Sequence, residues 1–209
     1  MKESHQRVQW VYEAKSNQEL ETKYDQWADI YDQDLTEEFV WKSPQAAATV
    51  LEKHVESSAK ILDAGAGTGL VGECLAKAGF NNLVAMDLSS GMLDVAKQKQ
   101  VYCEYHQMVL GELLAFASNE FDATISVGVF TQGHAPAKSL NELVRITKPN
   151  GMIVFSLRVE TYEQDGFKEQ QTELEQAGKW VLAEVSDRFQ PMPKGEPEVW
   201  HQIWAYRVK

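Results

Sequence analysis

Three closely spaced glycines follow an acidic residue in the stretch KILDAGAGTGLVG, residues 60–72. A short apolar run ends at Asp63, and Gly65, Gly67 and Gly69 then alternate with small residues before a helical pattern begins. Glycine lets a backbone turn tightly and lets a ligand approach it closely. A strand, a glycine-rich loop and a helix in this order are typical of sites that bind a nucleotide group. We therefore expect a nucleotide-like ligand over this loop.

The letters from Gly67 to Gly72 also satisfy the dinucleotide pattern G-x-G-x-x-G, in which a pyrophosphate lies at the start of the helix. Here, however, Asp63 occupies the end of the strand. A carboxylate repels a pyrophosphate and attracts an ammonium or a sulfonium, by roughly a few kcal/mol near a protein surface. The charge of Asp63 thus favours a cationic ligand. A P-loop is excluded because no G-K-[ST] follows the glycines.

A second acidic residue, Asp87, ends the next apolar run, NLVAMD. Two ribose hydroxyls can donate to the two oxygens of one carboxylate, which is a charge-assisted arrangement shared by several nucleotide cofactors. Asp87 therefore supports a dinucleotide and an adenosyl ligand equally. The choice between them depends on Asp63 and on the rest of the chain.

The run DAGAGTG, residues 63–69, resembles the glycine motif of class I S-adenosylmethionine (SAM) dependent methyltransferases, and Asp87 matches the acid that holds the ribose in that family. The resemblance implies a methyltransferase that binds SAM and releases S-adenosylhomocysteine (SAH). Many members carry an acid for the adenine where this chain has Leu110. The cofactor contacts expected in the core are Asp63, Ala64, Gly65, Gly67, Asp87, Leu88, Met92, Leu110, Gly111, Glu112 and Val127.

Ahead of the glycine stretch, apolar residues from Leu20 to Leu35 recur at the spacing of an amphipathic helix. This segment contains YDQWADIYD, which resembles the Y-D-x-x-A-x-x-Y-D segment that closes over the cofactor in many small class I methyltransferases. Its aromatic rings could meet the cationic part of the cofactor, and packing into the core is the alternative. The candidate cofactor contacts here are Tyr24, Trp27 and Tyr31.

Strand and helix patterns alternate from Ile61 onward, which is typical of a doubly wound α/β sheet. The last two expected strands, 180–185 and 199–208, have no helical crossover between them and should form an antiparallel edge pair. Together with the resemblance, this predicts a Rossmann-like seven-stranded sheet, mostly parallel, of the class I methyltransferase type. We expect one domain over residues 1–209, with residues 1–55 as a helical cap or lid and residues 56–209 as the Rossmann-like core.

Weaker signals set the expected limits of individual elements. Residues 1–17 form either a loose arm or a flap. Ser43 followed by Pro44 predicts a side-chain cap and the start of a helix, and Ser89 predicts another cap. Residues 101–109 have the pattern of a weak strand. Period-two spacing places four residues on one face of the last strand, namely Trp200, Trp204, Tyr206 and Val208.

In a doubly wound sheet, ligands bind beyond the carboxyl ends of the strands, where the connections change sides. The stretch VGVFTQGH, residues 127–134, lies where the family places the methyl group against its acceptor. Its V-G and G-H pairs and the Y-D-x-W-A opening resemble the small methyltransferase-like proteins of the Williams-Beuren syndrome region. An acceptor hydroxyl or ammonium needs a base, for which His134 is the candidate. A histidine bonded to nearby backbone is the alternative.

Composition limits the partners. The 209 residues include 20 basic and 31 acidic side chains, a net charge of -11 without a basic run, so nucleic acid is a disfavoured partner.

No stretch approaches the roughly eighteen apolar residues of a membrane span, so we expect a cytoplasmic protein. Cys74 and Cys103 lack a C-x-x-C pattern or a histidine at ligand spacing, so we expect buried reduced thiols and no metal.

The best-supported function is methyl transfer from SAM to an oxygen or nitrogen of an acceptor, with a small molecule favoured over a protein side chain. Two other classes stay open at this point. A non-catalytic SAM-binding partner protein would carry the same motifs, because they bind cofactor and do not prove transfer. An NAD(P)-dependent oxidoreductase would share the glycines and Asp87.

Overall fold

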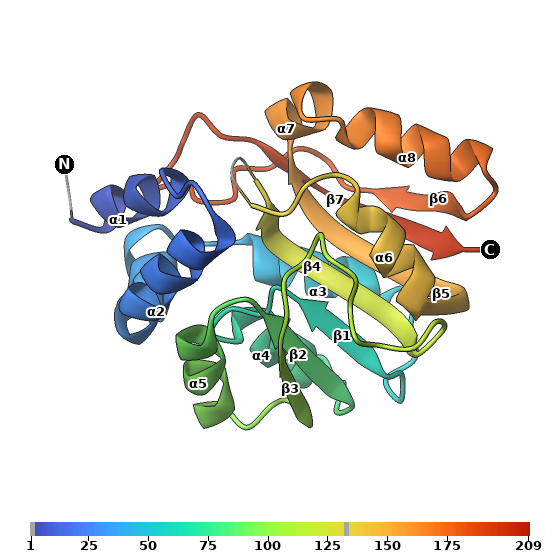
Figure 1. Ribbon diagram of the computed structural model, residues 1–209, viewed down its shortest axis with the longest axis horizontal. Helices are drawn as coiled ribbons and strands as arrows, with labels where there is room; N and C mark the ends of the chain where they lie inside the picture. Colours follow the sequence, from blue (N-terminus) through green and yellow to red (C-terminus); the bar gives the residue numbers. More distant parts are fainter. Residues whose placement is uncertain (1–2, 132–133) are drawn as a thin grey trace.

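The computed structural model describes residues 3–131 and 134–209, and these residues form a central seven-stranded sheet (Figure 1). Its order is β3-β2-β1-β4-β5-β7-β6. The first five strands in this order pair in parallel, and β7 is antiparallel to both β5 and β6. The predicted α/β sheet with an antiparallel edge pair is confirmed. The strands are β1 (Ile61–Ala64), β2 (Leu83–Asp87), β3 (Glu104–Gln107), β4 (Phe121–Phe130), β5 (Thr147–Arg158), β6 (Trp180–Val185) and β7 (His201–Val208).

Helices cover both faces of this sheet, so its central strands are buried on two sides. Figure 1 shows α6 in front of the sheet and α3 and α4 behind it. The pattern of α6 gives the reason, because Leu140, Leu143 and Ile146 recur at helical spacing and are fully buried. One face carries α3 (Ser43–Glu52), α4 (Leu70–Lys77) and α5 (Ser90–Gln98), and the other carries α6 (Ser139–Ile146), α7 (Val159–Gln164) and α8 (Phe167–Gln176).

Two N-terminal helices, α1 (Glu3–Tyr12) and α2 (Asn17–Gln33), lie side by side at one end of the sheet (Figure 1). Ser16 caps α2 by accepting a hydrogen bond from the Glu19 amide, and a π-helical turn, η1 (Asp34–Glu38), follows α2. In the segment 1–17, residues Glu3–Tyr12 form α1, which packs against α2 rather than hanging loose. Met1 and Lys2 lie outside the described residues. These helices share an apolar cluster of their own, which contains Val8, Val11, Leu20, Trp27, Leu35, Phe39 and Met192.

Several expected limits differ from the structure. Helix α3 begins at Ser43 itself, with Lys42 before it and no side-chain cap, because the Ser43 hydroxyl is buried without a hydrogen-bond partner among the described residues. The weak strand shortens to β3, and α7 was not predicted because only Thr161 of its six residues is buried. Both cysteines were expected to be buried, but Cys103 is exposed and Cys74 is only partly buried.

The set of residues expected on one face of the last strand, β7, also differs from the structure. Trp204, Tyr206 and Val208 do share one face of β7 and pack in one cluster. Trp200 does not join them, because the ladder with β5 begins at the pair Arg158 and His201. Trp200 precedes the strand and is 43% exposed.

Candidate functional site

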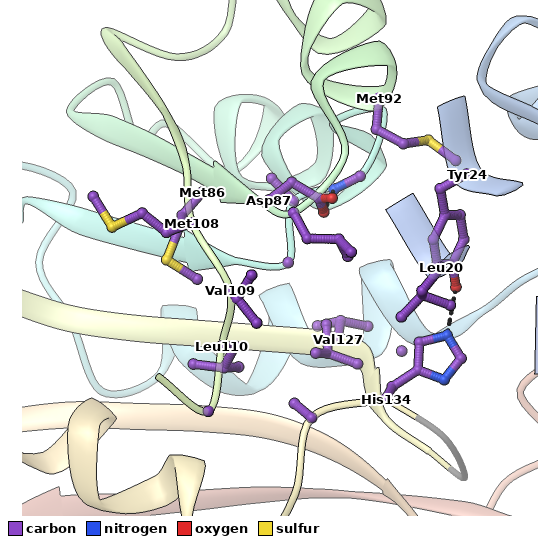
Figure 2. A pocket seen from close by; sticks show the side chains of 18 of the residues that line it. Leu20, Tyr24, Met86, Asp87, Met92, Met108, Val109, Leu110, Val127 and His134 are labelled. Atoms are coloured by element: carbon purple, nitrogen blue, oxygen red, sulfur yellow. Dashed lines mark hydrogen bonds between the residues drawn. The ribbon is translucent and has the colours of Figure 1, made fainter. Parts of the chain in front are cut away.

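A cavity of about 370 Å³ lies where the loops after β1, β2 and β4 meet α2 (Figure 2). β1 pairs with β2 on one side and with β4 on the other, so this is the point where the connections change sides. The structure brings most of the expected site residues together in the wall of this cavity. They are Tyr24, Tyr31, Gly65, Gly67, Asp87, Leu88, Met92, Leu110, Gly111, Glu112, Val127 and His134.

The glycine loop forms one wall and depends on backbone conformations that favour glycine. Gly65 has a φ of 86°, and a Cβ added there would lie 2.2 Å from Cγ2 of Val129. The loop is held down because the amides of Gly65 and Ala66 both donate to the Met86 carbonyl, at 2.7 and 2.9 Å. At Gly67 a Cβ would meet nothing within 4 Å, so the loop there faces open space. A ligand can therefore approach the backbone closely at Gly67.

Asp87 is fixed at the end of β2 by backbone amides. Its Oδ2 accepts from the Gly67 amide at 2.8 Å, and its Oδ1 accepts from the Ser89 amide at 2.9 Å. Burial raises the pKa of Asp87 to about 6, so the carboxylate is charged at neutral pH. Each carboxylate oxygen has two lone pairs, which leaves acceptor capacity for two ribose hydroxyls.

One end of the cavity is apolar. Figure 2 shows Met86, Met108, Val109 and Leu110 gathered there, with Asp87 between this end and Tyr24. The first three of these residues were not among the expected contacts. Met108 and Val109 follow β3, whose weak strand pattern left its end unplaced, and Met86 was assigned only to the strand that Asp87 ends. The end of β3 was the only signal that could have found Met108 and Val109. The apolar end matches what an adenine ring needs on its two faces.

Three expected contacts lie outside the cavity wall. Asp63 is fully buried, and its Oδ2 accepts a 2.6 Å hydrogen bond from the Tyr102 hydroxyl. Burial raises the pKa of Asp63 to about 7. Trp27 is directed into the cluster of α1 and α2, where its Nε1 donates to Oδ2 of Asp34 at 2.7 Å. Ala64 is also fully buried.

At the opposite end, His134 lies between two hydroxyl groups. Its Nε2 is 2.8 Å from the Tyr24 hydroxyl, and its Nδ1 is 3.0 Å from Oγ1 of Thr131 (Figure 2). The ring of Tyr12 meets the imidazole edge-on at 5.8 Å. Burial raises the pKa of Tyr24 well above its usual value, so this hydroxyl keeps its proton. Gln132 and Gly133, which belong to the expected acceptor motif, lie outside the described residues.

Acidic residues of α2 hold this helix over the cavity, a role that their helical spacing alone did not reveal. Asp25 Oδ1 accepts from the Ser89 hydroxyl at 2.6 Å and from the Gly91 amide at 2.8 Å. Asp32 accepts from the Thr68 hydroxyl and pairs with Lys99 Nζ at 2.7 Å. Helix α2 is thus bonded to the start of α5 and to the glycine loop.

Comparison with known proteins identifies the family. Residues 62–155 match the family model described as a methyltransferase domain. "Methyltransferase-like protein 27" of Homo sapiens is 33% identical over 186 residues, which is 85% of this chain and 75% of that protein. The chain belongs to the class I SAM-dependent methyltransferases.

Two further similarities concern parts of the chain or the fold alone. "Demethylmenaquinone methyltransferase" of Renibacterium salmoninarum is 42% identical over 98 residues, which is 46% of this chain and 39% of that protein. The chain thus spans less than half of that relative. A TehB-like SAM-dependent methyltransferase from Corynebacterium glutamicum has a TM-score of 0.65 at 20% identity, covering 90% of this chain and 99% of that one. It shares the fold.

The residues present fit SAM as the cofactor. The cavity has the size of small-molecule sites, with an apolar end for the adenine, Asp87 at the place of the ribose and open space over Gly67. Among residues 3–131 and 134–209, no group of three or more His, Cys, Asp or Glu side chains could hold a metal ion. In the same part of the chain, no helix is long and apolar enough to cross a membrane.

Proposed function

We propose that this methyltransferase acts on an oxygen or nitrogen of a small molecule, and that His134 accepts the proton that such an acceptor loses. The observation that carries the proposal is the pairing of His134 with Tyr24 in the cavity that also contains the glycine loop and Asp87. A hydroxyl or an ammonium must lose a proton when it is methylated, whereas a thioether or an already neutral amine need not.

We assign each residue of the cavity wall to the cofactor or to the acceptor by the end of the cavity at which it lies. Asp87 holds the ribose through both carboxylate oxygens, while Leu88, Met92 and Leu110 contact the adenine. Gly111 and Glu112 lie beside the adenine, and Tyr31, Gly65 and Gly67 line the remainder of the cofactor site. Val127 and His134 border the acceptor. Residues 1–55 act as a cap over the core formed by residues 56–209.

Bound SAM supplies a methyl group on a sulfonium, which is electrophilic without further activation. The protein therefore contributes alignment and exclusion of water. Helix α2 covers the cavity with Leu20, Tyr24 and Tyr31 and is bonded in place through Asp25 and Asp32. An acceptor O–H or N–H that takes the place of the Tyr24 hydroxyl would meet Nε2 of His134, while Thr131 fixes the other ring nitrogen.

Two observations support a small acceptor. The cavity is about 370 Å³ and is covered by α2, so much of it is filled once a cofactor is bound. The partial relative described above is a demethylmenaquinone methyltransferase, an enzyme named for an acceptor that is not a protein or a nucleic acid. The net charge of -11 also disfavours a nucleic acid acceptor.

The test is a transfer assay with tritiated SAM on a lysate fractionated by size, with and without RNase and protease. We expect label in the low-molecular-mass fraction, unaffected by either enzyme and dependent on the protein. Label that disappears with protease would show a protein acceptor instead. SAH binding without labelled product from any fraction would contradict the proposal and favour a non-catalytic SAM-binding protein.

A further inference from the structure

Tyr102 joins two parts of the cofactor loop that are not bonded to each other directly. Its hydroxyl donates to Oδ2 of Asp63 at 2.6 Å and accepts from the Gly72 amide at 3.1 Å. Asp63 ends β1 just before the glycine loop, and Gly72 lies in the first turn of α4 just after it. The side chain of Tyr102 is 7% exposed, so both hydrogen bonds are shielded from water.

Gly69, just before α4, and Gly72, in its first turn, leave room for the side chain of Tyr102. A Cβ at Gly72 would lie 2.3 Å from the Tyr102 hydroxyl oxygen, and a Cβ at Gly69 would lie 3.1 Å from the ring. The last glycine of the formal G-x-G-x-x-G pattern therefore makes room for Tyr102. The glycine at position 72 is thus accounted for without a bound pyrophosphate.

Among the described residues, no basic group acts on the pKa of Asp63. The titratable groups that act on it are Tyr102 and Asp87, and Asp63 in turn acts on Cys74 of α4. Its neighbours in the sheet, Ala85 and Ile125, do not titrate. The second oxygen, Oδ1, is buried without a hydrogen-bond partner among the described residues. A cation bound over the loop would therefore supply an attraction that Asp63 otherwise lacks.

We propose that Tyr102 is a positioning residue for the SAM site, which holds the Asp63 carboxylate and the first turn of α4 in one arrangement. Asp63 then acts on the ammonium of the cofactor through the glycine loop rather than by direct contact from the cavity wall. The inference concerns cofactor binding and does not depend on the acceptor proposed above.

The experiment measures SAH binding by calorimetry for the full chain and three variants. Tyr102→Phe removes both hydrogen bonds of the hydroxyl and should weaken SAH binding by about tenfold. Tyr105→Phe is the matched control, because Tyr105 packs edge-on against Tyr102 at 5.7 Å and lines no cavity wall. Its affinity should equal that of the parent protein. Equal affinity for Tyr102→Phe would overturn the proposal.

A second readout separates positioning from a general loss of structure. Asp63, with a pKa of about 7, is neutral at low pH and charged above it, so SAH affinity should rise between pH 6 and 8. Asp63→Asn should remove most of this rise and leave only the part near pH 6 that Asp87 contributes. Tyr102→Phe should move the rise to higher pH, because the lost donor stabilised the charged carboxylate.

The outcomes distinguish the two proposals. An unshifted pH profile in Tyr102→Phe, or a rise of undiminished size in Asp63→Asn, would show that Tyr102 acts only on the fold and would overturn the inference. Failure of the parent protein to bind SAH would overturn it as well. Tight SAH binding without methylated product would leave the inference standing and would contradict only the proposed transfer to a small molecule.

Discussion

The hydroxyl of Tyr24 lies 2.8 Å from Nε2 of His134, which bonds helix α2 to the loop after β4. Both residues line the cavity, and Thr131 occupies the other ring nitrogen at 3.0 Å. Both nitrogens of His134 are therefore engaged by hydroxyl groups. An acceptor has to displace the Tyr24 hydroxyl, or pass its proton through it, before His134 can act as a base.

Removing the imidazole tests this role directly. His134→Ala should lower turnover by about 100-fold or more, because general bases contribute factors of that order. SAH affinity should change little, since Asp87 and the glycine loop remain. The measurement is transfer of tritiated methyl to the lysate fraction that the parent protein labels, with SAH calorimetry alongside. Turnover equal to that of the parent protein would exclude His134 as the base.

The hydroxyl of Tyr24 is tested without disturbing its ring. Tyr24→Phe should lower turnover by roughly 5- to 30-fold, the effect of about one lost hydrogen bond at the base. Tyr31→Phe is the control, because Tyr31 also lines the cavity on α2 and packs against Tyr24 at 6.4 Å. A faster Tyr24→Phe enzyme would show that the hydroxyl only blocks His134.

The ribose assignment predicts a loss of cofactor affinity. Asp87→Ala should weaken SAH binding by about 1.5 to 3 kcal/mol at pH 8, since a charge-assisted bidentate contact is lost. The loss should shrink at pH 5, below the Asp87 pKa of about 6, because the parent carboxyl is then mostly protonated. Asp94→Ala on the exposed face of α5 is the control. An unchanged dissociation constant for Asp87→Ala at pH 8 argues against ribose binding.

The buried acid of β1 should make stability depend on pH. The Asp63 pKa is raised from 3.8 to about 7 by burial, so the folded protein binds this proton more tightly than the unfolded chain. Its contribution to stability is therefore full below pH 4 and is lost as pH rises through 7. Asp63→Asn should gain stability over the parent protein as pH rises, by on the order of a few kcal/mol at pH 8. Urea unfolding at pH 5 and pH 8 measures this gain, and an equal difference at both values would contradict it.

The glycine loop should not tolerate a side chain at its start. Gly65→Ala should destabilise the fold by about 1 to 3 kcal/mol, because the new Cβ would lie 2.2 Å from Val129 Cγ2 at a φ of 86°. Gly79→Ala is the control for backbone strain alone, since Gly79 has a φ of 95° and open space around it. Thermal unfolding should separate the two. A Gly65→Ala loss no larger than that of Gly79→Ala would show that the contact with Val129 relaxes freely.

The sequence predicted those features whose signals are local. The glycine loop and Asp87 were recognisable because strand, loop and helix follow one another directly, and the edge pair was recognisable because no helix separates its strands. The cap of α5 at Ser89 is confirmed for the same reason, since its side chain accepts from the Met92 amide three residues on.

Features that depend on distant partners could not be predicted. Asp63 and Tyr102 are 39 positions apart, and no pattern in the chain tells that a tyrosine rather than a ligand bonds the carboxylate. Similarly, Trp27 fits both a cofactor contact and a core residue by spacing, and its bond to Asp34 decides for the core. Met108 and Val109 enter the cavity because β3 ends at Gln107, a limit that weak strand propensity leaves open.

Asp25 belongs to α2, whereas the Ser89 hydroxyl and the Gly91 amide that donate to it lie at the start of α5. Lifting α2 away from α5 would leave the Gly91 amide and the Ser89 hydroxyl without this partner, at the turn that carries Met92 of the cavity wall. Moving α2 away from α5 therefore costs these two hydrogen bonds until water replaces them. Opening of the cavity along this edge is opposed by polar contacts that the closed arrangement satisfies without water.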